Sequence, residues 1–72
     1  MAKVVEILEL SDGRLIAVLD NKKMYLRMSG QILLPCRKKK DGSFAVTGEP
    51  IITPILMRTM EELKMAVEDI AK

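Results

Sequence analysis

Apolar and polar residues alternate in blocks along the first half of the chain. Apolar residues dominate 4–10 and 14–19, on either side of Ser11-Asp12-Gly13. Residues 4–10 alone suit a helix or a strand, but Asp-Gly between two apolar runs is a strong β-hairpin signal, because Gly13 adopts a positive φ at little cost. The pattern therefore predicts two antiparallel strands, and the second strand, without polar alternation, is expected to be covered on both faces.

Two more strands are predicted by the next blocks. Residues 24–28 alternate apolar and polar side chains, which predicts a third strand with one apolar face. A turn at 29–30 leads into a fourth strand over 31–36. Because Pro35 has no backbone donor, this strand either ends there or lies at an edge of the sheet.

A second Asp-Gly pair, at 41–42, predicts another hairpin, which leads into a short fifth strand over 43–47. Residues 51–57 leave two alternatives open. They form a sixth, edge strand interrupted by Pro54, or they begin the helix early, because Thr53-Pro54 is a cap followed by a proline at the first helical position.

The last segment has a helical period. Thr59 and Glu62 form a capping-box pattern, so a helix is predicted over about 59–71. Apolar residues recur in it at spacings of three and four, which places them on one stripe. The stripe residues are Met60, Leu63, Val67 and Ile70.

These elements predict an α+β fold in a single small domain over residues 1–72. Strands within 4–56 form a small antiparallel five- to six-stranded sheet or a partly closed barrel, and one C-terminal amphipathic helix follows. The longest apolar run has five residues, whereas a membrane-spanning helix needs about 20, so no membrane segment is expected.

The apolar content exceeds what one small core hides. Of the 72 residues, 49% are hydrophobic but only 3% are aromatic, and six are methionines. A chain of this size buries only about 60% of its unfolded surface. We therefore expect a homo-oligomer or a protein partner, with the stripe of the predicted helix as one candidate interface, against the alternative of a monomer with scattered exposed apolar residues.

The net charge of +2 hides a basic centre. Residues 1–21 carry two cations and four acids, and residues 41–72 carry three cations and six acids. Residues 22–40 carry seven cations and no acid. In an up-and-down meander, the turns that hold most of these cations lie at the same end of the sheet and attract phosphate. The candidate nucleic-acid-binding residues are Lys22, Lys23, Arg27, Arg37, Lys38, Lys39 and Lys40. The alternative is that lysines at turns and edges keep the sheet soluble.

Few residues are suited to catalysis. The chain has no histidine and one cysteine, so no enzymatic activity, metal site or cofactor is expected. Cys36 has no partner for an intramolecular disulfide, which is typical of a reducing, cytoplasmic setting. The cations after it would lower its thiol pKa and favour a redox role, whereas burial at a strand end would leave it inert.

Two segments carry partial resemblances. Residues 5–28, with Ser11-Asp12-Gly13-Arg14 between strands, resemble the first half of the RNA-binding Sm-like barrels, but the N-terminal helix is absent. Residues 39–44, followed by Gly48-Glu49-Pro50 and a helix, are similar to the arm-type DNA-binding domains of phage integrases, although the connecting segment is shorter. Neither covers half of the chain with a specific motif, and no family is assigned.

Two functions are consistent with the sequence. The first is a small oligomeric, non-enzymatic module that binds an anionic partner, such as a nucleic-acid backbone, through its basic turns. Contact with bases is expected to be poor, because Tyr25 and Phe44 are the only aromatic residues. The second is a protein-interaction or structural subunit whose basic turns serve solubility only.

Overall fold

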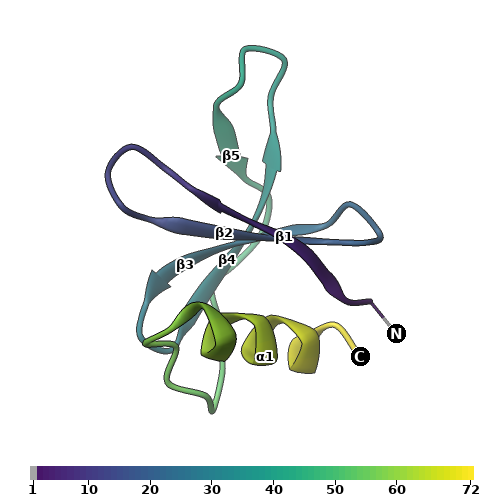
Figure 1. The fold of residues 1–72 in the computed structure, drawn as a ribbon. Coiled ribbons are helices and arrows are strands. Elements are labelled where there is room, and N and C mark those ends of the chain that lie inside the picture. The colour runs from purple at the N-terminus through teal and green to yellow at the C-terminus, as the bar shows by residue number, and fades with distance from the viewer. Residues whose placement is uncertain (1) are drawn as a thin grey trace.

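The computed structural model describes residues 2–72, which form one antiparallel sheet with a helix packed on one face (Figure 1). The elements are β1 (Val4–Glu9), β2 (Leu15–Leu19), β3 (Met24–Ser29), β4 (Ile32–Lys38), β5 (Phe44–Val46), β6 (Ile51–Ile52) and α1 (Met60–Ile70). The strand order is β1-β2-β3-β4-β5, and β6 also pairs with β4. The predicted α+β class is confirmed. The sheet is open, because β1 and β5 do not pair within residues 2–72.

Three hairpin turns share one local design. In each, a side-chain oxygen accepts the backbone N–H two residues later: Asp12 from Arg14, Asn21 from Lys23 and Asp41 from Ser43, each at 3.0 Å. The intervening residue adopts a positive φ, at +90° in Gly13 and Gly42 and at 72° in Lys22. The two Asp-Gly hairpins predicted from sequence are confirmed, and the Asn21-Lys22 turn uses the same geometry without glycine.

Pro35 does not end the fourth strand. The strand extends to Lys38, two residues beyond the predicted end. Along one edge, β4 pairs with β6 at Ile32 and Leu33 and with β5 from Cys36 onward, so Pro35 lies between the two paired segments. Its carbonyl accepts the Thr47 N–H at 2.9 Å. A proline is tolerated there because the ladder is interrupted at that position.

The segment before the helix combines a short strand with a loop. Residues 51–52 form β6, as in the strand alternative, and Pro54 lies beyond it. Thr53 does not cap a helix. Its buried Oγ1 accepts the Ile55 N–H at 2.9 Å, and α1 begins only at Met60.

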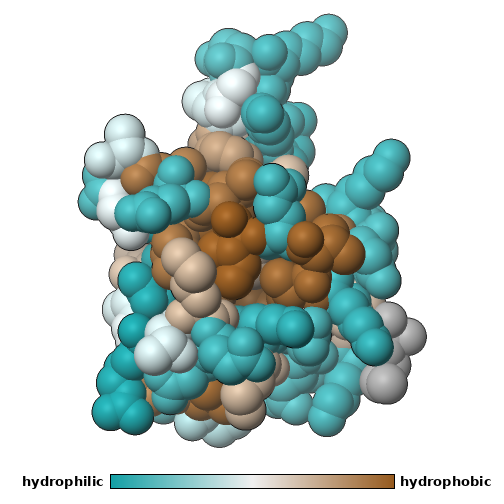
Figure 2. All heavy atoms as spheres, in the orientation of Figure 1, coloured by the Kyte–Doolittle hydropathy of each residue, from teal (hydrophilic) through white to brown (hydrophobic). Residues whose placement is uncertain are grey.

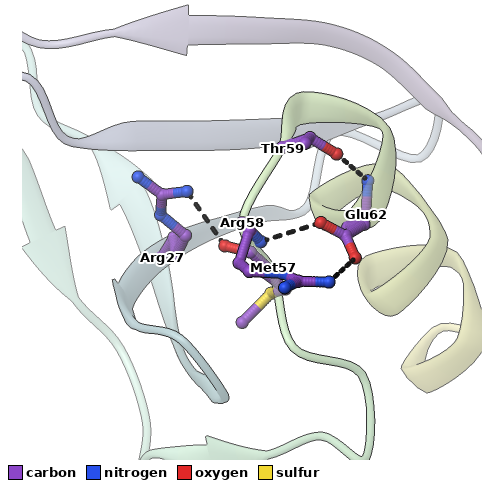
Figure 3. Close-up of polar contacts among 5 residues, drawn as sticks. All are labelled: Arg27, Met57, Arg58, Thr59 and Glu62. Atoms are coloured by element: carbon purple, nitrogen blue, oxygen red, sulfur yellow. Dashed lines mark hydrogen bonds and ion pairs between the residues drawn. The ribbon is translucent and has the colours of Figure 1, made fainter.

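The helix begins where the sequence predicts. Thr59 Oγ1 accepts the Glu62 N–H at 3.1 Å (Figure 3). In the usual capping box, the glutamate side chain accepts the backbone N–H of the capping residue, which here would be Thr59. In this protein the glutamate bonds one residue earlier. Glu62 Oε1 accepts the N–H of Arg58 at 3.1 Å, and the guanidinium of Arg58 lies 3.7 Å from Glu62 Oε2.

The main core lies between α1 and one face of the sheet, which we call the first face. From α1, Leu63, Ala66 and Val67 are buried there. From the sheet and the preceding loop, the core contains Leu15, Ala17, Leu19, Leu33 and Met57. The opposite face, which we call the second face, has its own smaller cluster of Ile16, Leu26 and Cys36. In residues 2–72, α1 is too short to span a membrane, and no other helix is present.

Candidate nucleic-acid interface

The hairpin of β4 and β5 projects from the body of the protein, at the top of Figure 1. We call residues 36–46 the basic ribbon, because residues 37–40 are four consecutive exposed cations. Arg37 is in register with Ala45 and Lys38 with Phe44. Since successive residues of a strand point to opposite faces, Arg37 and Lys38 present charge on opposite sides of the ribbon.

The tip of the basic ribbon is held by a tight hydrogen-bonded turn. The Lys39 N–H donates to the Ser43 carbonyl at 2.7 Å, and the Gly42 N–H donates to the Lys39 carbonyl at 3.1 Å. Asp41 Oδ1 accepts the Ser43 hydroxyl at 2.6 Å and its N–H at 3.0 Å. These two bonds hold the pKa of Asp41 below its ordinary value.

The cations of the basic ribbon form no ion pair within the described chain. The ion pairs found in residues 2–72 join Arg14 to Asp12, Arg58 to Glu62 and Lys72 to Asp69. None of them involves residues 37–40. The ribbon therefore presents concentrated positive charge to solvent.

The predicted second group of cations lies at the β2–β3 turn. This turn leaves the same end of the sheet as the basic ribbon, but Figure 1 shows the two tips pointing apart, to the right and upward. Lys23 lies nearer the ribbon, since it lines a cleft of about 210 Å³ together with Pro35, Cys36 and Thr47. The twist of the sheet separates the Lys22 tip from the tip of the ribbon.

Arg27 does not join this surface. Its Nη1 donates to the Met57 carbonyl at 3.1 Å, and the contact is partly buried (Figure 3). Register with Leu33 places Arg27 on the first face, beside the loop that leads into α1. The sequence carried no signal for this contact, because only the position of α1 shows that the helix covers the face with Tyr25 and Arg27. Arg27 therefore has a structural contact rather than a place among the exposed cations.

The predicted interface stripe of α1 is largely covered by the chain's own sheet. Leu63 and Val67 are fully buried in the main core, and Ile70 packs against it. Met60 is 52% exposed. The exposed apolar surface of the helix consists of Met60 and Met65, and the stripe pattern did not include Met65. Most of the predicted interface stripe therefore packs in the protein's own core and is not exposed to a partner.

Cys36 lies on the second face with 7% of its surface exposed. Burial raises the pKa of its thiol. Of the two alternatives for Cys36, the structure agrees with burial and not with a pKa lowered by the following cations, because desolvation dominates. This environment is that of a structural cysteine rather than a reactive one.

No three cysteine, aspartate or glutamate side chains in residues 2–72 gather closely enough to hold a metal ion. No protein-family model, curated protein or solved structure matches the chain.

Proposed function

We propose that this protein is a small non-enzymatic module that binds the phosphate backbone of nucleic acid through its basic ribbon. The observation that supports this proposal is the projecting two-stranded hairpin, whose residues 37–40 are all exposed cations without an ion pair in the described chain. Lysine and arginine that neutralise phosphates release condensed counterions, which is the main source of sequence-independent affinity.

The shape of the ribbon suits a duplex. The major groove of B-DNA, about 12 Å wide, admits a two-stranded β-ribbon. With Arg37 and Lys38 on opposite sides and Lys39 and Lys40 at the turn, a ribbon in the groove would carry cations toward both phosphate walls. The Lys23 side chain, near the base of the ribbon, would add a contact outside the groove.

Recognition of bases is expected to be weak. Tyr25 is partly buried on the first face and Phe44 is partly buried on the second, so neither forms an open stacking platform. Arg37 is the only arginine of the ribbon, which limits bidentate reading of guanine. We therefore propose binding that favours duplex backbone and depends little on sequence.

Fluorescence anisotropy with a labelled duplex at low salt tests the proposal. We expect the wild type to bind the duplex. We expect Lys39→Ala/Lys40→Ala to bind it at least about tenfold more weakly, since two phosphate contacts are lost. The matched control is Lys3→Ala/Lys72→Ala, which removes the same charge near α1, away from the ribbon. Absence of wild-type binding, or equal loss in the control, would contradict the proposal.

A protein-interaction or structural role is the second candidate. The observation that favours it is the apolar second face, which no helix in residues 2–72 covers. In that case the lysines of the ribbon keep an exposed sheet edge from pairing with other chains. Wild-type protein that fails to bind duplex at low salt would favour this function over the first.

A further inference from the structure

The tip of the basic ribbon is slim and polar. Residues 37–43 are all exposed, whereas Phe44 is half-buried and packs against the cluster of the second face. Between the apex and Phe44, the returning strand carries only Gly42 and Ser43, so the long side chains of the tip all come from the other strand. In Figure 2 the projecting end is covered by hydrophilic side chains, and apolar surface begins below it. The tip can therefore enter a polar groove without burying apolar side chains.

The length of the tip matches the depth of a major groove. From Lys38, in register with Phe44, to the apex at Asp41, a strand rise of about 3.4 Å per residue gives about 7–10 Å. The major groove of B-DNA is about 8.5 Å deep. When the tip reaches the floor of such a groove, Arg37 and Lys38 lie at its mouth, between the two phosphate backbones.

The charges of the ribbon distinguish entry into a groove from contact along the outside of a duplex. Arg37 and Lys38 point to opposite faces of the ribbon, so a flat contact uses the cations of only one face. The apex also carries an acid, Asp41, which follows the four cations. Phosphates repel its carboxylate, but the floor of the major groove offers the amino groups of adenine and cytosine. Entry tip first therefore places both signs of charge favourably.

We propose that the basic ribbon enters the major groove of B-form DNA tip first, and that this mode of binding selects a DNA duplex over an RNA duplex. The inference rests on the proposed function and names its partner. The major groove of an A-form RNA helix is too deep and narrow for side chains to read. RNA therefore meets the ribbon only through its outer backbone, where the cations of one face make contact.

Binding of two matched duplexes tests the selection. A DNA duplex and an RNA duplex of the same length and sequence, with uracil in place of thymine, carry the same number of phosphates. We expect wild-type protein to bind the DNA at least about tenfold more tightly at the same salt concentration, because about two phosphate contacts are lost on RNA. Lys39→Ala/Lys40→Ala is expected to lose most of this preference, and the control Lys3→Ala/Lys72→Ala is expected to keep it.

A DNA duplex that contains glucosylated 5-hydroxymethylcytosine tests the groove. Its sugars are uncharged and occupy the major groove, while its phosphates are unchanged. We expect wild-type protein to bind it at least about tenfold more weakly than unmodified DNA, because the tip no longer reaches the floor of the groove.

The outcomes separate this inference from the proposed function. RNA bound as tightly as DNA, or glucosylated DNA bound as tightly as unmodified DNA, would overturn entry into the major groove and leave binding of the phosphate backbone intact. Failure of wild-type protein to bind any of these duplexes at low salt would overturn both.

Discussion

The backbone N–H of Val4 donates to Glu68 Oε2 at 2.8 Å, a contact that joins the start of β1 to α1 across 64 residues of sequence. The contact is partly buried, so removing the carboxylate leaves a backbone donor without its partner. We expect Glu68→Ala to lower the free energy of unfolding by about 1–2 kcal/mol, and Glu68→Gln, which keeps an acceptor, to lower it less. Urea denaturation measures both.

The matched control for Glu68 is Glu61→Ala. Glu61 is exposed on the same helix, and no hydrogen bond of its side chain is found in residues 2–72. We expect Glu61→Ala to change stability little, and equal losses at positions 61 and 68 would contradict a specific role for the Val4 contact.

Lys22 occupies the left-handed position that Gly13 and Gly42 occupy in the other two hairpin turns. A non-glycine residue in that region costs about 1–2 kcal/mol. We expect Lys22→Gly to raise the free energy of unfolding by roughly 0.5–1 kcal/mol, net of the greater entropy of glycine in the unfolded chain. Thermal and urea unfolding measure the change.

The reverse substitution at Gly42 is the companion test. A Cβ there meets no atom within 4 Å, so the cost of Gly42→Ala is conformational rather than steric. We expect a loss of about 1 kcal/mol. If Lys22→Gly destabilises the protein while Gly42→Ala has no effect, backbone strain does not explain the two turns.

Thr59 caps α1 through the bond from the Glu62 N–H to its Oγ1. Thr59→Ala is expected to cost about 1 kcal/mol, whereas Thr59→Ser or Thr59→Asp keeps the cap. Thr47→Ala serves as the comparison, because the bond found for Thr47 uses its backbone N–H. A helix signal in circular dichroism that melts at the same temperature in Thr59→Ala and the wild type would refute the cap's contribution.

Two hairpin carboxylates make stability depend on acid pH. The bond from the Arg14 N–H lowers the pKa of Asp12, and the hydroxyl and N–H of Ser43 lower the pKa of Asp41, in both cases from an ordinary 3.8. Since the folded-state pKa lies below the unfolded one, their stabilisation is present above 3.8 and is lost as pH falls through the folded value.

The amide variant Asp12→Asn/Asp41→Asn tests this pH dependence. Each amide keeps a side-chain acceptor for the turn but does not titrate. We expect the melting temperature of the variant to fall less steeply than that of the wild type as the pH is lowered below 3.8. Parallel curves would show that these two carboxylates do not contribute.

Local chemistry predicted most of the elements. Asp12-Gly13 and Asp41-Gly42 identify their hairpins because the side-chain bond and the positive φ are encoded within a few residues. Thr59 identifies the helix start for the same reason. The unbroken apolar run of β2 predicted cover on both faces, and Leu15, Ile16 and Ala17 are indeed buried.

Features that depend on distant segments were not predictable in the same way. Pro35 is accommodated only because β5 and β6 share one edge of β4, which is a property of two later segments. The first face of β3 carries Tyr25 and Arg27, and only the position of α1 shows that this less apolar face is the one the helix covers. The divergence of the Lys22 and Lys40 turns likewise follows from the twist of the whole sheet.

The salt dependence of duplex binding tests the central claim most directly. If residues 37–40 contact phosphates, the logarithm of the association constant falls linearly with the logarithm of salt concentration, with a slope of about −0.9 per phosphate. We expect Lys39→Ala/Lys40→Ala to make that slope shallower by about 2, and Lys3→Ala/Lys72→Ala to leave it unchanged. A ribbon variant with the wild-type slope would contradict binding through the basic ribbon.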